Sequence, residues 1–329
     1  MTWQGRQVLV TGAGGFIASH LIERLVEMDA KVRAFVRYNS RGDWGTLQWL
    51  PADTFTQIEI IAGDLRDASA IRQAARDVEI IFHLGALIAI PYSYVHPREV
   101  IETNILGTLN VLEAAREFRV AKIVHTSTSE VYGTAVTVPI SESHPLKGQS
   151  PYSASKIGAD KIAESFYRAL KVPVATIRPF NTYGPRQSAR AVIPTIITQA
   201  LTRNDIKLGS LHPTRDFTFV KDTVEGFLLV AESPNTIGQE LNVGSDTEIS
   251  IQALAQKIIS LIGRPVEIVT DEQRLRPAKS EVERLWADNR KAKQLIGWAP
   301  RTSLDEGLRQ TIDWVSKNIE RYRPNEYTI

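Results

Sequence analysis

The sequence predicts an α/β protein in which helices cover both faces of a doubly wound parallel sheet, with a smaller mixed α/β lobe beside it. Short β-branched runs alternate with longer helical patterns through the first half of the 329 residues. The strand-like runs are almost continuously apolar, as expected of strands that are buried on both sides. After about residue 180 the pattern becomes irregular and prolines interrupt it, which indicates the second lobe.

Local patterns predict each element in order. Aliphatic and β-branched residues fill six runs, which we expect to be strands at 7–11, 31–37, 58–62, 79–84, 121–126 and 172–178. Apolar residues at helical spacing fill the intervals and predict helices at 16–28, 68–75, 99–118 and 151–170. The second half retains two recognisable helices, 251–262 and 304–319. We expect the segments 215–222 and 240–243 to return to the main sheet.

Composition excludes several classes of function. Lys and Arg number 39 against 37 Asp and Glu, and this balance predicts no nucleic-acid partner. The chain has no cysteine, which excludes disulfides, cysteine-bound metals and thiol nucleophiles. The longest apolar stretch is shorter than the roughly 20 residues that a membrane span needs. Without a signal-peptide pattern or a metal-binding histidine motif, the sequence predicts a cytoplasmic enzyme with no membrane partner and no metal.

A glycine-rich turn joins the first strand to the first helix. Gly12 permits a tight turn, Gly15 lets the backbone approach a pyrophosphate, and Ala18 allows close packing of helix and strand. The helix N-terminus would then hold the phosphates. We therefore predict a Rossmann-like dinucleotide-binding domain at residues 1–180 and a second domain at 181–329. The expected contacts of the dinucleotide with this turn and with later strand ends are Gly12, Gly14, Gly15, Phe16, Ile17, Asp64, Leu65, Leu84, Gly85 and Ala86.

The end of the second strand bears on the choice between NAD and NADP. An acidic residue at this position binds the ribose 2′-hydroxyl of NAD. Here the strand ends in Arg37, and Asn39 and Ser40 follow, a set that suits a 2′-phosphate. The sequence therefore favours NADP. Asp64, which follows the third strand, is expected to meet the adenine amino group.

Two polar segments at strand ends carry the candidate chemistry. Thr128 follows the fifth strand, and Tyr152 and Lys156 lie four residues apart on the helix before the sixth, so their side chains share a face. Ser150 is the expected N-cap and Pro151 the first helical residue. The helix dipole and the Lys156 ammonium would both stabilise a phenolate at Tyr152. We therefore expect Tyr152 to act as a base near neutral pH.

These motifs, in this order, resemble those of the extended short-chain dehydrogenase/reductase superfamily over nearly the whole chain. They are Thr-Gly-x-x-Gly-x-x-Ala from residue 11, Ser-Thr-Ser-Glu-Val-Tyr-Gly from residue 127 and Tyr-x-x-x-Lys from residue 152. Within the superfamily the chain is similar to the nucleotide-sugar epimerases and dehydratases. Residues 35–45 and 186–194 are similar to bacterial dehydratases of the legionaminic-acid type, which act on nucleotide-linked N-acetylglucosamine.

The resemblance implies a role for each catalytic candidate. Thr128 and Tyr152 would flank the sugar C4 hydroxyl, whose proton Tyr152 removes while hydride leaves C4 for the nicotinamide. Lys156 would tune Tyr152 and hold the nicotinamide ribose. Glu130 would take the C5 proton and deliver it to the departing C6 hydroxyl, after which hydride returns to C6. Ser129 stands where dTDP-glucose dehydratases carry an aspartate, so the pattern is closer to that of GDP-mannose dehydratases.

The expected activity is therefore 4,6-dehydration of a nucleotide-diphosphate hexose, with GDP- or UDP-N-acetylglucosamine as the favoured substrates. Simple 4-epimerases generally lack a carboxylate at the position of Glu130. Thr-Ser-Glu also occurs in UDP-glucuronate decarboxylases, so the triplet does not exclude that reaction. A 4-epimerase and a dinucleotide sensor without catalytic activity also stay open as alternatives.

The resemblance implies that residues 181–329 form the nucleotide-sugar-binding domain, which must hold the substrate's diphosphate and base. Guanidinium groups suit this task because they bind phosphate through two parallel hydrogen bonds. Arg215 is expected here because it matches a family motif that holds the nucleotide, and Arg276 also rests on motif position. Arg190 is included only for its proximity. The full set of candidate substrate contacts is Asn181, Arg186, Arg190, Arg215 and Arg276.

The helices at 99–118 and 151–170 are apolar on more than one face, so each should be covered on two sides. Relatives pair these two helices across a dimer axis. The resemblance therefore implies a homodimer.

Overall fold

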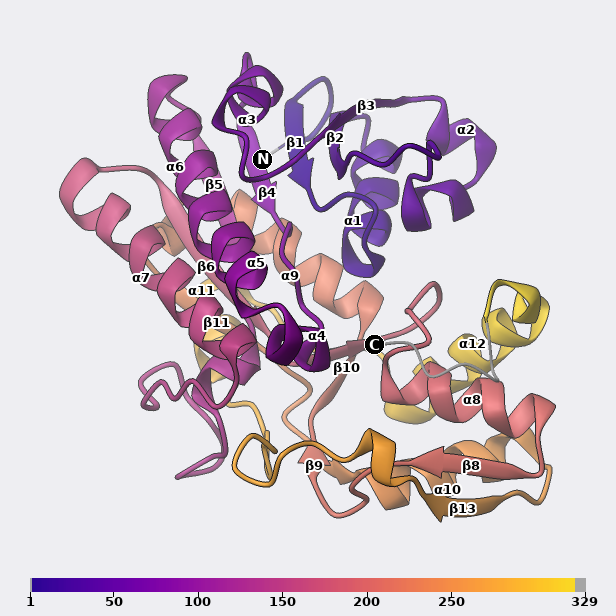
Figure 1. Ribbon diagram of the computed structural model, residues 1–329. Helices are drawn as coiled ribbons and strands as arrows, with labels where there is room; N and C mark the ends of the chain where they lie inside the picture. Colours follow the sequence, from indigo (N-terminus) through magenta and orange to yellow (C-terminus); the bar gives the residue numbers. More distant parts are fainter. Residues whose placement is uncertain (1, 323–329) are drawn as a thin grey trace.

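A seven-stranded parallel sheet forms the larger lobe of the computed structural model, which describes residues 2–322 (Figure 1). Its strand order is β11-β6-β5-β4-β1-β2-β3, so the chain changes direction across the sheet between β1 and β4. Ligands of such sheets bind outside the carboxyl ends of the strands at this switch point. The strands are β1 (Gln7–Thr11), β2 (Lys31–Arg37), β3 (Ile58–Gly63), β4 (Ile80–His83), β5 (Lys122–Thr126), β6 (Val174–Pro179) and β11 (Glu240–Val243).

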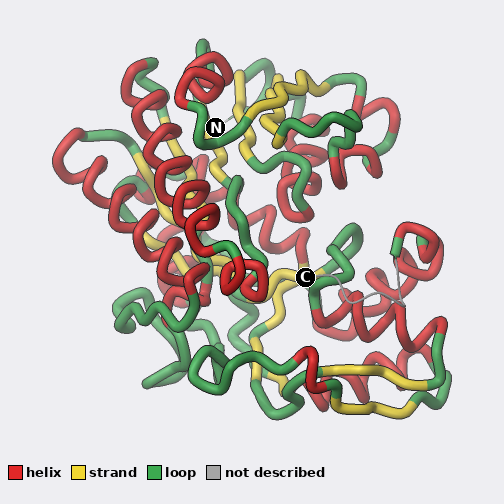
Figure 2. Tube along the Cα trace, in the orientation of Figure 1, coloured by secondary structure: helices red, strands yellow, loops and turns green. Residues whose placement is uncertain are grey.

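Helices cover both faces of this sheet, as the sequence predicts (Figure 2). Side chains alternate along each strand. Leu9 packs with the helices of one face, whereas Val8 and Val10 pack with those of the other. The first face carries α3 (Ala68–Ala75), α6 (Gly107–Glu117) and α7 (Pro151–Leu170), and the second carries α1 (Phe16–Glu27) and α9 (Val220–Glu232).

Capping residues fix where α7 begins. The Ser150 hydroxyl accepts a hydrogen bond from the Ser153 amide, and the Ser153 hydroxyl accepts one from the Ser150 amide. Pro151 is the first helical residue. This start places Tyr152 in the first turn, at the end of the helix that faces the strand carboxyl ends.

The helix predicted at 99–118 is irregular. It consists of α5 (Pro97–Ile101), a π-helical turn η2 (Glu102–Leu106) and α6. The turn directs the buried Asn104 side chain at the loop after β4, where it exchanges hydrogen bonds of 2.8 and 3.0 Å with the amide and carbonyl of Leu87. Asn104 also donates to Ser155 of α7 at 2.9 Å, so it ties that loop to the helix that carries Tyr152.

The second lobe is built from short sheets and three longer helices. One expectation is wrong, because residues 215–222 do not return to the main sheet: β10 pairs with β7 instead. Residues 240–243, in contrast, form the edge strand β11 beside β6. The paired strands are β7 (Asn181–Tyr183) with β10 (Phe217–Phe219), β9 (Thr214–Arg215) with β12 (Ile249–Ser250), and β8 (Asp205–Leu208) with β13 (Glu267–Thr270). Its helices are α8 (Val192–Thr202), α10 (Ile251–Ile262) and α12 (Leu304–Lys317). Shorter helices elsewhere in the chain are α2 (Ala52–Phe55), α4 (Ile90–Val95) and α11 (Arg290–Ile296).

Within residues 2–322, no helix has both the length and the apolar character that crossing a membrane requires.

Candidate active site

A pocket of about 610 Å³ lies at the carboxyl ends of the central strands. It contains most of the residues that the sequence predicts to hold a dinucleotide: Gly12, Gly14, Gly15, Phe16, Ile17, Arg37, Asn39, Leu84 and Ala86, together with the catalytic candidates Thr128 and Tyr152. Ser40, Asp64, Leu65 and Gly85 do not line it. We call this cavity the dinucleotide pocket.

The glycine turn fits a bound pyrophosphate. Gly12 has a φ of +67°, and a Cβ there would lie 2.6 Å from the Cα of Gly85, so no other residue is tolerated without a shift. Gly15 is the N-cap of α1 and has no side chain to satisfy the N–H groups of the first turn. These groups and the positive end of the helix dipole are therefore available to an anion.

Sequence reasoning missed the loop that packs on this turn. The Thr46 amide donates to the carbonyl of Gly14 at 3.0 Å, and its hydroxyl donates to the carbonyl of Gly15 at 2.8 Å. Trp44 and Gly45 line the dinucleotide pocket beside the turn. The loop is compact because the Asn39 side chain bonds the backbone of Arg41 and Asp43, so Asn39 shapes the loop rather than standing free for a ligand.

Asp64 is held by a neighbour. Its carboxylate lies 2.7 Å from the guanidinium of Arg66, whose hydrogen bonds lower the pKa of Asp64 despite partial burial. The carbonyl of Leu65 accepts a hydrogen bond from the side chain of Asn110 on α6. The contact expected between Asp64 and adenine therefore has no support from the pocket geometry.

Thr128 and Tyr152 lie together in the wall of the dinucleotide pocket, and a hydrogen bond joins their side chains. Burial raises the pKa of Tyr152, the hydrogen bond with Thr128 lowers it, and the charge of Glu130 raises it again. The phenol is therefore held protonated in the ligand-free chain. Ser129 is buried and Glu130 is half-buried, and neither lines this pocket or the one described below, although the charge of Glu130 acts on Tyr152.

The predicted stabilisation of a Tyr152 phenolate by Lys156 is not seen. The Lys156 ammonium donates instead to the carbonyl of Thr126 at 2.7 Å. Burial lowers the pKa of Lys156 to about 8, while the charge of Asp160, one helical turn further on, raises it. Asp160 is itself fully buried and accepts hydrogen bonds from Ser127 at 2.6 Å and from Arg178 at 3.0 Å. Sequence reasoning missed Asp160, although its position four residues after Lys156 places it on the same helix face.

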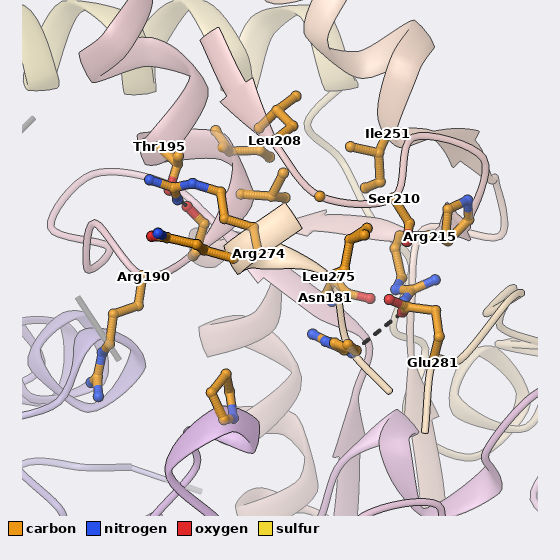
Figure 3. Close-up of a pocket in the computed structure, with 18 of the residues that line it drawn as sticks. Asn181, Arg190, Thr195, Leu208, Ser210, Arg215, Ile251, Arg274, Leu275 and Glu281 are labelled. Carbon is orange, nitrogen blue, oxygen red and sulfur yellow. Dashed lines mark hydrogen bonds and ion pairs between the residues drawn. The ribbon is translucent and has the colours of Figure 1, made fainter. Parts of the chain in front are cut away.

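A second pocket of about 500 Å³ adjoins the first, and Thr182 and Gln187 line both. We call it the substrate pocket. Four of the predicted substrate contacts line it, namely Asn181, Arg190, Arg215 and Arg276. Figure 3 shows Arg215 near Glu281 at one end of this pocket and Arg190 at the other.

The substrate pocket also contains Glu281, an acidic residue that the sequence did not predict there. Its carboxylate lies 3.1 Å from the guanidinium of Arg215 and 3.5 Å from that of Arg276. A bound diphosphate would compete with this carboxylate for both arginines. The side-chain oxygen of Asn181 is buried without a hydrogen-bond partner among the described residues, and Nη1 of Arg276 has only its 3.5 Å ion pair with Glu281, so both can pair with a polar ligand.

Arg186 does not belong to either pocket, contrary to the sequence prediction. Its guanidinium is buried against α1, where it donates to Nδ1 of His20 at 2.6 Å and pairs with Glu23. The other ring nitrogen of His20 bonds the carbonyl of Pro185 at 2.8 Å. The motif that contains Arg186 therefore joins the two lobes through this arginine.

This contact predicts an acid-sensitive fold. Burial, and then the charge of Arg186, lowers the pKa of His20 from 6.5 to about 3, so the folded chain holds His20 neutral. The stability gained is complete above pH 6.5 and is lost as the pH falls toward 3. We expect the loss of unfolding free energy between pH 7 and pH 4.5 to be about 2–3 kcal/mol smaller in His20→Gln. Urea titrations at both pH values measure it, and equal losses in the two proteins would contradict this assignment.

The glycine turn, the Thr128–Tyr152 pair and the adjoining arginine-lined pocket define a Rossmann-type enzyme that uses a dinucleotide on a phosphorylated substrate. The chain belongs to the GDP-mannose 4,6-dehydratase family, whose model matches residues 9–311. It is thus an enzyme of the NAD-dependent nucleotide-sugar dehydratases and epimerases within the extended short-chain dehydrogenase/reductases, as the motifs predict.

Relatives of this chain catalyse different reactions. It is 33% identical to a UDP-glucose 4-epimerase of Mycolicibacterium smegmatis, over 94% of this chain and 98% of the relative. It is 32% identical to UDP-glucuronic acid decarboxylase 1 of Xenopus tropicalis, over 98% and 75%. Among solved structures, a dTDP-glucose 4,6-dehydratase of Streptomyces venezuelae with NAD bound matches with a TM-score of 0.87 and 28% identity, over 97% and 100%.

Proposed function

We propose that the protein is a nucleotide-sugar 4,6-dehydratase that converts a nucleotide-linked N-acetylglucosamine, carried by GDP or UDP, to its 4-keto-6-deoxy derivative. The observation that carries this proposal is the position of Glu130. Its carboxylate has no hydrogen-bond partner among residues 2–322, yet it acts electrostatically on both Tyr152 of the dinucleotide pocket and Arg215 of the substrate pocket. A carboxylate whose charge acts on a residue of each pocket is a candidate to move a second substrate proton.

The roles of the residues follow from this arrangement. Bound in the dinucleotide pocket, a nicotinamide dinucleotide supplies a reversible hydride acceptor. Thr128 orients the C4 hydroxyl of the sugar, and Tyr152, once it has lost its own proton, accepts the hydroxyl proton as the phenolate. The resulting 4-keto group acidifies the proton on C5. Glu130 removes that proton and delivers it to the C6 hydroxyl, which leaves as water. The 4-keto-6-deoxy product then requires the hydride, which the dinucleotide would supply to C6, and a solvent proton at C5. Arg215 and Arg276 hold the diphosphate.

Glu130 also bears on two other reactions of the family. A 4-epimerase has to move only the proton of the C4 hydroxyl, so the Glu130 carboxylate would have no role in that reaction. A UDP-glucuronate decarboxylase loses carbon dioxide from C6, and the Thr-Ser-Glu triplet is compatible with it. The mass of the product separates the three: loss of water supports dehydration, loss of carbon dioxide decarboxylation, and an unchanged mass epimerisation.

We also propose that NADP is the preferred dinucleotide. Arg37 ends β2 where NAD-specific sheets carry an acid, it lines the dinucleotide pocket, and its side chain is 62% exposed. We expect wild-type protein to bind NADPH more tightly than NADH in a fluorescence titration. Arg37→Ala should lose this preference, whereas a clear preference of the wild type for NADH would contradict the proposal.

A homodimer through residues 99–118 and 151–170 is the proposed assembly. Leu112 and Val111 are buried within the chain, but Ile101 and Leu106 are 44% and 47% exposed on neighbouring turns. Burial of these side chains against a second copy would stabilise a dimer. Light scattering at micromolar concentration should give twice the chain mass, and Ile101→Glu/Leu106→Glu should give the monomer. A monomeric wild type would refute the dimer.

A further inference from the structure

Arg37, which lines the dinucleotide pocket, belongs to an ion pair that the proposed reaction does not use. The guanidinium of Arg37, at the end of β2, lies 3.0 Å from the carboxylate of Glu99 on α5. Glu99 also accepts a hydrogen bond from the hydroxyl of Tyr92. Its side chain is only 25% exposed, so it is less free to move than Arg37.

Further charges surround this pair. Arg66 lies 2.7 Å from Asp64 and 3.8 Å from Glu102. The hydrogen bond from Tyr92, and also the charges of Arg37 and Arg66, lower the pKa of Glu99 against the effect of partial burial, so Glu99 is ionised at neutral pH. The cluster therefore holds two guanidinium groups and three carboxylates. It has one more negative charge than positive charge.

We propose that Glu99 is a specificity-determining residue that sets how strongly the protein prefers NADP over NAD. The inference rests on the proposed use of a dinucleotide. Glu99 occupies the guanidinium that a 2′-phosphate would need, and its charge opposes that phosphate. The uncharged 2′-hydroxyl of NAD does not need the Arg37 guanidinium, so the Arg37–Glu99 ion pair persists when NAD binds.

The physical argument is one of exchange between two anions. A phosphate monoester carries a charge of about −1.5 to −2 at neutral pH and pairs with guanidinium through two hydrogen bonds. Arg37 must exchange the Glu99 carboxylate for the phosphate, and the remaining charges then face the new anion. Removing the charge of Glu99 makes the cluster neutral and leaves Arg37 unpaired. The affinity for NADPH should therefore rise, while the affinity for NADH should change little.

Equilibrium titrations with NADH and NADPH, followed by fluorescence, test this on wild type, Glu99→Gln, Arg37→Ala and the double variant. We expect Glu99→Gln to tighten NADPH binding about tenfold, which is the equivalent of about 1.4 kcal/mol, and to change NADH binding less than about twofold. The gain should disappear in the double variant, because no guanidinium is left to release. Glu102→Gln is the matched control: it removes the same charge from the cluster, 3.8 Å from Arg66, but leaves the Arg37–Glu99 pair in place, so NADPH binding should gain clearly less than in Glu99→Gln.

Two further variants guard against a purely structural effect. Tyr92→Phe removes the hydrogen bond that the Tyr92 hydroxyl donates to Glu99 but keeps the Glu99 carboxylate. The ratio of the NADPH and NADH affinities should therefore stay as in wild type. Glu99→Ala replaces Glu99→Gln if the latter fails to fold. An affinity ratio that Glu99→Gln leaves unchanged, or shifts toward NADH, overturns the inference. Wild-type protein that binds neither dinucleotide would instead defeat the proposed function, and this inference with it.

Discussion

Tyr152→Phe lowers kcat by about 10²–10⁴-fold, the range expected when a positioned proton acceptor is lost. Phenylalanine keeps the buried ring and its packing, and removes only the hydroxyl that bonds Thr128. Binding of NADPH and of the nucleotide sugar should change little, because the first depends on the glycine turn and Arg37 and the second on the substrate-pocket arginines. Steady-state rates and equilibrium titrations on the same preparation measure the two effects separately.

Tyr167→Phe is the matched control for this variant. Tyr167 lies on α7 as well, but it lines neither the dinucleotide pocket nor the substrate pocket. Its activity should remain within about twofold of wild type. If Tyr152→Phe were as active as Tyr167→Phe, the enzymatic role of Tyr152 would be excluded, and a sensor without catalytic activity would become the better account.

Glu130→Gln has the second large effect, and it separates dehydration from the step at C4. The amide cannot accept the C5 proton, so water loss should fall by at least about 10²-fold. In D₂O, wild-type product should carry solvent deuterium at C5, because the original C5 proton leaves with the water and solvent supplies the proton that replaces it. The variant should show neither water loss nor deuterium at C5, by mass and by proton NMR.

The exposed Glu113 of α6 provides the control, since Glu113→Gln removes one carboxylate from the same domain without touching either pocket. Dehydration at the wild-type rate by Glu130→Gln would remove Glu130 from the mechanism. It would also remove the observation that favours a dehydratase over an epimerase.

The sequence predicted those parts of the site that depend on local pattern. Gly12, Thr128 and Tyr152 each follow or precede a strand, and carboxyl ends of parallel strands meet at one edge. Knowledge of strand positions was therefore enough to bring them together. The start of α7 at Pro151 was equally local, because the cap lies within three residues of it.

The parts that could not be predicted depend on contacts between distant segments. Arg186 pairs with Glu23, 163 residues earlier, and nothing near Arg186 in the sequence indicates this. Glu281 lies between Arg215 and Arg276 only because β9 and the loop around residue 281 meet across the substrate pocket. Lys156 donates to the carbonyl of Thr126, 30 residues earlier in the chain, and no local pattern indicates that contact. Helical spacing gave the shared face of Tyr152 and Lys156 but not the direction of the lysine.

The mass of the product formed from UDP- and GDP-N-acetylglucosamine by wild-type protein loaded with NADP tests the central claim most directly. The account predicts that one of these substrates loses one molecule of water, with no net change in the oxidation state of the dinucleotide at the end of the reaction. A product of unchanged mass from these substrates, or carbon dioxide released from UDP-glucuronate in place of dehydration, would contradict it.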